Sequence, residues 1–202
     1  MVTTPDYQPG SDDDADLLLR LSAILVAGKT LTTQVRWVDT HGDLRFTATL
    51  DSEGVTVEGL TLFGRASASL PGTAVTFGLR WAKTPGRYDH FDRLDWKPSH
   101  VHNNKGLGAP EWRFRPFQTS HHHSLVLNAA TEVGLLNAMA DNLPVAEPVI
   151  PEPANWEAIL ALVGERWNIT DLINVPYPPW QYDILQRPGA ASRRGEVKER
   201  PS

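Results

Sequence analysis

Residues 44–50 read Leu-Arg-Phe-Thr-Ala-Thr-Leu, and this alternation of apolar and polar residues decides the fold class. Successive side chains of a β-strand point to opposite faces of the sheet. The apolar residues of the stretch therefore share one buried face, made of Leu44, Phe46, Ala48 and Leu50. The polar residues between them face solvent, and they are Arg45, Thr47 and Thr49. The stretch predicts a half-buried antiparallel strand.

Three further stretches, at residues 33–38, 55–62 and 74–81, have the composition of strands, with many valine, threonine, phenylalanine and leucine residues. Short turn sequences, such as His41-Gly42-Asp43 and Pro71-Gly72, separate the stretches. A helical crossover does not fit into such short connections. We therefore expect the strands to pair as an antiparallel meander.

Helical patterns precede and follow the predicted meander. Leucine and isoleucine residues recur at helical spacing between Asp12 and Gly28. After the meander, a helix is expected from Asn128 to about Asn142, and a proline-rich connector covers residues 144–153. Asn155 then begins a last helix, whose apolar stripe consists of Trp156, Ile159, Leu160, Val163 and Trp167. The prediction is an α+β fold with an N-terminal helix, an antiparallel meander and two C-terminal helices packed on the sheet.

The 202 residues suit one domain with polar ends. We expect residues 1–11 to be disordered, residues 12–186 to form a single α+β domain, and residues 187–202 to be a disordered polar tail. No apolar run approaches the ~20 residues of a membrane span, and the acidic N-terminus lacks the pattern of a signal peptide. A cytoplasmic protein without membrane partners is therefore expected. The absence of cysteine excludes disulfides, thiolate nucleophiles and cysteine-bound zinc.

The segment of residues 87–128 differs in composition from the rest of the chain. It contains six of the seven histidines and several lysines and arginines, in a protein whose net charge is −5. We expect strands at residues 90–95 and 111–117, joined by a loop at 96–110, and another short strand at 121–127. Arg93 can form an ion pair with Asp95, or with Glu111 on a neighbouring strand, and this structural interpretation is favoured over one in which Asp92 orients His90.

The histidines of this segment allow two kinds of chemistry. His100 and His102 face the same way if their segment is extended, and with His121 or His123 they can supply three ligands to a metal. No helical metal-binding spacing is present, so we expect no metal or other cofactor and no convergence of the histidines. Alternatively, His100, His102, His121 and His123 act as catalytic acids and bases, because imidazole titrates near neutral pH.

Alternation along a strand places His121 and His123 on one face and His122 on the other. A polar strand start at a sheet edge explains the three histidines equally well.

The basic and aromatic residues nearby suit a surface that holds phosphate and stacks bases, and the candidates are Arg93, Lys105, Trp112 and Arg113. Stacking of arginine on tryptophan within the protein is the competing explanation. The chain lacks the GxSxG, phosphate-loop and GxGxxG motifs, which excludes the commonest hydrolase and nucleotide-binding signatures.

Residues 93–95 read Arg-Leu-Asp, and Pro98, His102-Asn103 and a glycine-rich turn into Ala109-Pro110 follow. Residues 167–176 read WNITDLINVP. These features resemble a family of small, uncharacterised bacterial and phage-encoded proteins, and the likeness spans about residues 15–180. More distantly, the layout of central histidines is similar to that of the TumE-type toxins of prokaryotic toxin–antitoxin systems. The family has His-x-His where this chain has Glu111-Trp112-Arg113, so the family's histidines are lost here unless His121 and His123 replace them.

Three functions follow as hypotheses. The first is a small prokaryotic or phage toxin-like protein that cleaves RNA without a metal, with RNA or an antitoxin-like protein as its partner. The central histidines supply the acid and base, and Lys105 and Arg113 hold the phosphate. The second is a non-catalytic accessory or binding protein of a mobile-element or defence locus. A histidine-ligated metal protein is the third alternative.

Overall fold

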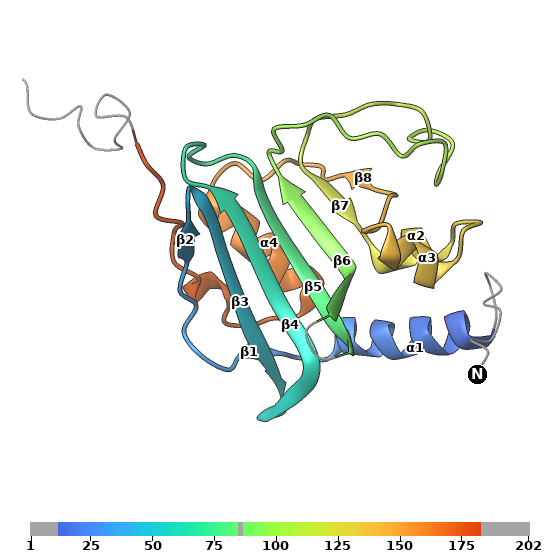
Figure 1. The fold of residues 1–202 in the computed structure, drawn as a ribbon, viewed down its shortest axis with the longest axis horizontal. Coiled ribbons are helices and arrows are strands. Elements are labelled where there is room, and N and C mark those ends of the chain that lie inside the picture. Colours follow the sequence, from blue (N-terminus) through green and yellow to red (C-terminus); the bar gives the residue numbers. More distant parts are fainter. Residues whose placement is uncertain (1–11, 85–86, 183–202) are drawn as a thin grey trace, which may run out of the picture.

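The computed structural model describes residues 12–84 and 87–182. The two ends that we expect to be disordered, residues 1–11 and 187–202, lie outside these ranges. The described chain has the expected α+β fold, with an N-terminal helix, an antiparallel sheet and C-terminal helices (Figure 1). No helix within the described ranges is long and apolar enough to cross a membrane.

The sheet has eight strands, and neighbouring strands run antiparallel in the order β1-β3-β4-β5-β6-β7-β8, with β2 paired to β3. The strands are β1 (Thr30–Leu31), β2 (Val38–Thr40), β3 (Asp43–Ser52), β4 (Val55–Ser67), β5 (Val75–Thr84), β6 (Arg87–Trp96), β7 (His121–His123) and β8 (Glu147–Pro148). The meander prediction is confirmed for β3 to β6. The expected strand at residues 33–38 is wrong, because β1 and β2 flank that stretch and only Val38 of it lies in a strand.

Burial along β3 follows the alternation in its sequence. The four apolar residues predicted to face the core are buried, and Arg45, Thr47 and Thr49 are exposed. Phe46 pairs with Gly64 of β4, and a Cβ on Gly64 would lie only 2.0 Å from the Phe46 ring. Gly64 therefore leaves the space that the aromatic ring fills.

The helices are α1 (Asp12–Val26), α2 (Leu125–Ala129), α3 (Leu135–Ala140) and α4 (Trp156–Trp167), with a 3-10 turn at Leu172–Asn174. The prediction for α4 is confirmed: the Asn155 side chain accepts a hydrogen bond from the backbone N–H of Ala158, and the whole predicted stripe is buried. Trp156 lies in an aromatic cluster with Trp37, Phe77, Trp96 and Trp180. This cluster attaches α4 to the sheet.

The single helix expected from Asn128 to Asn142 is wrong. Two short helices stand there instead, because Gly134 adopts a positive φ of 77° and separates α2 from α3. Asn128 lies inside α2, where its buried side chain bonds the backbone of Val145. Ser124 is the residue that caps α2. The carboxylate of Asp14, from α1, accepts hydrogen bonds from the N–H groups that begin α3.

The helix α4 covers one face of the sheet, whereas no described helix covers the face turned toward the viewer in Figure 1. A β-bulge determines which residues of β6 reach this uncovered face. Leu79 pairs with Asp92, but the next residue, Arg80, pairs with His90, so that Phe91 is the extra residue. Phe91 and Asp92 are both buried, while His90 lines a cavity with Arg93. The bulge therefore separates Asp92 from His90, so the alternative in which Asp92 orients His90 is wrong.

Candidate functional site

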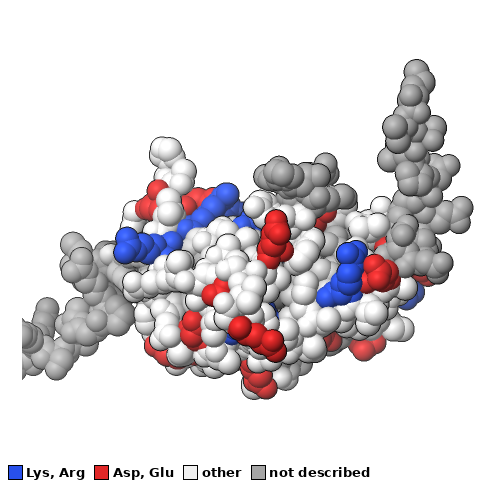
Figure 2. All heavy atoms as spheres, turned by 90° about the horizontal axis from the view of Figure 1, so that it is seen from below, with Lys and Arg blue, Asp and Glu red and all other residues white. Residues whose placement is uncertain are grey.

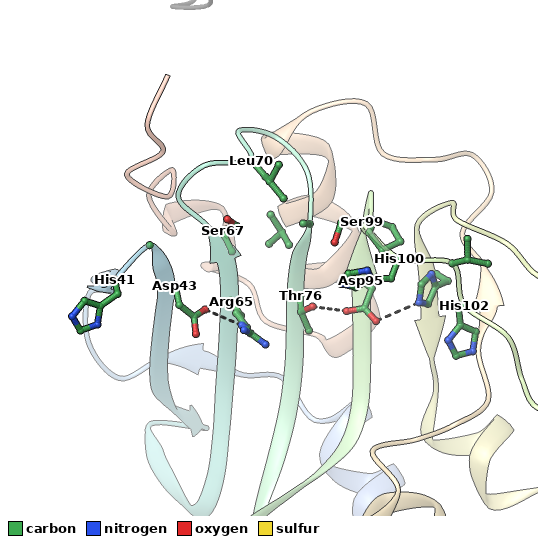
Figure 3. A pocket seen from close by; sticks show the side chains of 17 residues that line it. His41, Asp43, Arg65, Ser67, Leu70, Thr76, Asp95, Ser99, His100 and His102 are labelled. Carbon is green, nitrogen blue, oxygen red and sulfur yellow. Dashed lines mark hydrogen bonds and ion pairs between the residues drawn. The ribbon is translucent and has the colours of Figure 1, made fainter. Parts of the chain in front are cut away.

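A row of polar residues crosses the uncovered face from β3 to β7. Strand pairing places Arg45 opposite Arg65, Arg65 opposite Thr76, Thr76 opposite Asp95, and Asp95 opposite His121. Figure 3 shows Asp43, Arg65, Thr76 and Asp95 following one another across neighbouring strands. Residues far apart in the sequence are therefore brought together by the register of the sheet.

The three consecutive histidines alternate as predicted. His121 and His123 contact Asp95, whereas His122 contacts Asp92 on the opposite face. All three histidines are buried, and β7 is paired on both sides by β6 and β8. The alternative of a polar strand start at a sheet edge is therefore wrong.

His122 belongs to a buried network on the side of α4. Its Nε2–H donates to Asp92 Oδ1 at 2.5 Å, and Arg166 donates to its Nδ1 at 2.9 Å. Asp92 also accepts hydrogen bonds from Trp167 Nε1 and from the backbone N–H of Leu125. These contacts connect β6, β7, α2 and α4, so the network holds the core together and has no access to the uncovered face.

Asp95 is the centre of the opposite cluster. Its Oδ2 lies 3.3 Å from His121 Nε2 and 3.2 Å from His123 Nε2, and its Oδ1 accepts a 2.5 Å hydrogen bond from Thr76. Burial alone raises the pKa of Asp95, but the contact with His121 and the charge of Arg93 outweigh burial and hold the pKa well below its usual range. Asp95 is therefore a carboxylate at neutral pH.

His102 reaches the cluster from the loop that follows β6. The loop is held by two backbone hydrogen bonds between His102 and Phe117, and residues 111–117 form no strand, so that prediction is wrong. The His102 ring lies 4.9 Å from the His121 ring and 4.8 Å from the His123 ring. One nitrogen from each of the three histidines falls within 4.8 Å of the other two. The expectation that the histidines do not converge is therefore wrong for these three.

Each histidine of the cluster has one ring nitrogen bound to a carbonyl oxygen. His121 Nδ1–H donates to Thr119 O at 2.8 Å, and His123 Nδ1–H donates to Leu143 O at 2.6 Å. His102 Nε2–H donates to Asn104 Oδ1 at 2.7 Å, and both ends of the Asn104 amide bond the backbone of Ala146. Carbonyl oxygens accept but cannot donate, so these bonds fix which nitrogen carries the proton. The remaining nitrogens are His102 Nδ1, His121 Nε2 and His123 Nε2.

Two histidines of the cluster, His102 and His123, have a lowered pKa and are neutral at pH 7. Burial lowers the pKa of His123 to about 3, and although Asp95 acts in the opposite direction it does not compensate. Burial also lowers the pKa of His102, despite its hydrogen bond with Asn104. Each of these imidazoles therefore has a lone pair on its second nitrogen.

Arg93 closes one side of the cluster. Its Nη2 donates to His123 Nε2 at 2.6 Å, and its Nη1 donates to the carbonyl of Asn142 at 2.8 Å. Its Nε lies 3.2 Å from Asp95 Oδ2, which confirms the expected pairing of Arg93 with Asp95. Arg93 thus places a cation beside the carboxylate and occupies one imidazole lone pair.

The cluster borders an open cavity of about 500 Å³. His102, His121 and Asp95 line the inner side, and Arg65 and Asp43 line the side formed by β3 and β4 (Figure 3). His100 is exposed at the rim of the same cavity. This volume lies within the range of small-molecule sites.

The other candidates from the sequence lie apart from the cluster. Lys105 is exposed, and the guanidinium of Arg113 donates to the carbonyl of Gly108 within its own loop. Trp112 packs against Phe117, and the guanidinium of Arg115 lies over the Trp112 ring, 5.3 Å from the ring centre. None of Lys105, Trp112 and Arg113 lines the cavity beside the histidines.

The surface charges on the face drawn in Figure 2 likewise do not form the basic surface expected for RNA binding. On that face acidic and basic side chains are interspersed, and no broad basic area gathers there. A continuous basic surface is the usual footprint of nucleic-acid binding. The cations relevant to the site are instead the arginines of the uncovered sheet face.

Comparisons of the chain with protein-family models, with curated proteins and with solved structures each found no match. The resemblance to the family of small bacterial and phage proteins and to TumE-type toxins therefore stays a prediction.

Proposed function

We propose that the protein is a metalloprotein in which His102, His121 and His123 bind one divalent transition-metal ion beside the open cavity. The observation that carries this proposal is the hydrogen-bonding pattern of the three imidazoles. Each one donates its other ring N–H to a carbonyl oxygen. Metal-binding histidines are held in this way, because the bond fixes the tautomer and the orientation of the ring.

The kind of metal follows from the ligand set. Three imidazoles suit zinc, iron, nickel or copper, whereas magnesium and calcium prefer oxygen ligands. Asp95 Oδ2 lies beside the Nε2 atoms of His121 and His123, so its carboxylate can complete the ligand set and offset the charge of the ion. An ion held by histidines next to a cavity supplies Lewis-acid chemistry or an activated water to a bound substrate.

The test uses full-length protein without an affinity tag, stripped of metal with a chelator and titrated with zinc by calorimetry. We expect one ion per chain. His102→Ala and His121→Ala should weaken zinc binding at least tenfold, and His100→Ala, at the rim of the same cavity, serves as the matched control. Equal zinc binding by all four proteins, or a loss confined to His100→Ala, would overturn the proposal.

Cleavage of RNA without a metal is the second candidate. It is favoured by the position of His100 and His102, which line one cavity together with Arg65. One imidazole would take the proton of the ribose 2′-hydroxyl, the other would protonate the leaving oxygen, and Arg65 would steady the phosphate. An antitoxin-like partner and a cytoplasmic location belong to the same proposal.

Two experiments separate this second candidate from the metalloprotein. RNA cleavage that persists in excess chelator and is lost in His100→Ala would support a metal-independent endoribonuclease. Expression of the wild type from a tightly controlled promoter should then arrest growth and degrade RNA. Harmless expression with intact RNA would favour the non-catalytic accessory protein over the toxin.

A further inference from the structure

A second cavity, of about 370 Å³, opens beside the first one on the uncovered face of the sheet. It is lined by Arg45, Phe63, Arg65, Thr76, His90, Arg93, Asp95 and Asn142. Arg65, Thr76 and Asp95 line both cavities. A ligand in the second cavity would therefore lie next to the histidine cluster.

The second cavity is positively charged although the whole chain is acidic. Three arginines line it, Arg45, Arg65 and Arg93, and Asp95 is the only carboxylate among its described lining residues. A fourth arginine, Arg80, stacks on the Phe63 ring at 4.5 Å from its centre. A protein of net charge −5 thus collects arginines at one place on one sheet face.

One buried nitrogen at this cavity, His90 Nδ1, makes no hydrogen bond within the described chain. Arg93 Nε also lacks a hydrogen bond, but it forms an ion pair with Asp95 Oδ2 at 3.2 Å. His90 is held there because Gly78 has no side chain: a Cβ at Gly78 would lie 2.6 Å from His90 Nδ1. Buried polar atoms normally have a partner, so His90 Nδ1 is a polar group at this cavity that a bound ligand would satisfy.

We propose that the second cavity binds the phosphate group of a phosphate monoester, whose remaining part extends into the first cavity. Guanidinium groups present pairs of N–H donors that match the oxygens of a phosphate. The exposed Arg45 and Arg65 supply such donors, Arg93 adds a third positive charge, and this set suits a dianion better than a singly charged carboxylate. This phosphate site adds a substrate class to the proposed metalloprotein. It rests on that proposed function only for the metal centre next to the phosphate.

Asp43 holds two of the arginines in the absence of a ligand. Arg45 Nε donates to Asp43 Oδ2 at 2.7 Å, and Arg65 Nε donates to Asp43 Oδ1 at 2.8 Å. More than half of each arginine side chain is still exposed. Asp43 therefore competes with a phosphate for the guanidinium N–H groups of Arg45 and Arg65. Removal of the Asp43 carboxylate should strengthen phosphate binding.

Phenyl phosphate is the probe, measured by calorimetry on the metal-free and the zinc-loaded full chain, with benzoate as the singly charged comparison. We expect phenyl phosphate to bind more tightly than benzoate. Arg45→Gln and Arg65→Gln should each weaken it on the order of tenfold, as expected for the loss of a charge-assisted hydrogen bond. Asp43→Asn should strengthen it several-fold. Arg36→Gln, at an exposed arginine that lines neither cavity, is the matched control.

The outcomes separate the two proposals. Phenyl phosphate that fails to bind to either form, or binds equally to wild type and Arg65→Gln, or binds more weakly to Asp43→Asn, would overturn the phosphate site. Zinc binding by the histidines can still succeed in that case. Conversely, phenyl phosphate binding to a protein that takes up no zinc would leave the phosphate site and remove the metal centre.

Discussion

Asp95 faces His121 directly across the pairing of β6 with β7, and its Oδ2 lies 3.3 Å from His121 Nε2. The neighbouring pair on the same face joins Arg93 to His123. These two pairs, separated by the Leu94–His122 pair on the opposite face, bring an acid, a cation and two imidazoles together. The loop that follows β6 adds the third imidazole, His102, and the proposed metal centre depends on this arrangement.

Arg93 should compete with a metal ion for the cluster. Its Nη2 occupies His123 Nε2, and its charge repels a cation at the same place. Arg93→Gln should therefore raise the affinity for zinc, roughly tenfold, in a competition titration with a chelating dye. Arg113→Gln, whose guanidinium bonds its own loop, is the control and should leave the affinity unchanged. Weaker zinc binding by Arg93→Gln would mean that Arg93 supports the site and does not compete for it.

Phe46 should be one of the main contributors to stability. Its ring is 3% exposed and packs edge-on against Trp37 at 4.8 Å between ring centres. Phe46→Ala should lower the free energy of unfolding by about 3–5 kcal/mol, because it leaves a cavity in the core. Val55→Ala, at a valine that is 70% exposed, should change it by less than about 0.5 kcal/mol. Chemical denaturation of both variants checks this, and equal effects would contradict the assignment of the core face.

His90 should make stability depend on pH. Burial, assisted by the charges of Arg80 and Arg93, lowers the pKa of His90 to about 4 from an ordinary value of 6.5. The unfolded chain therefore binds a proton at this residue between about pH 6.5 and pH 4, and the folded chain does not. The free energy of unfolding should fall as the pH decreases through this window. His90→Gln should remove this part of the pH dependence, and an unchanged slope in denaturation measured from pH 7 to pH 4 would refute the assignment.

Much of the sheet could be predicted because its signal is local. The alternation from Leu44 to Leu50 indicates a strand and also its buried face, since both follow from the period of the backbone. The same period predicts that His121 and His123 share a face. Asn155 begins α4 as predicted, because its side chain caps a neighbouring N–H group.

The site could be predicted only in part, because it depends on contacts between distant residues. Nothing local shows that Phe91 forms a bulge, yet that bulge sends Asp92 to the core and His90 to the uncovered face. The role of Asp95 follows from its register opposite His121, which the sequence does not contain. The position of His102 depends on its pairing with Phe117, and Lys105, Trp112 and Arg113 are held elsewhere by contacts within the same loop.

The most direct test of the metal centre is X-ray absorption spectroscopy of the zinc-loaded, untagged protein. Zinc–nitrogen bonds in proteins measure about 2.0–2.1 Å, and imidazole rings add a recognisable outer-shell signal. We predict three imidazole nitrogens at that distance together with oxygen ligands, and a loss of imidazole signal in His102→Ala. A spectrum of zinc bound by oxygen alone, or one that His102→Ala leaves unchanged, would contradict the assignment of His102, His121 and His123 as metal ligands.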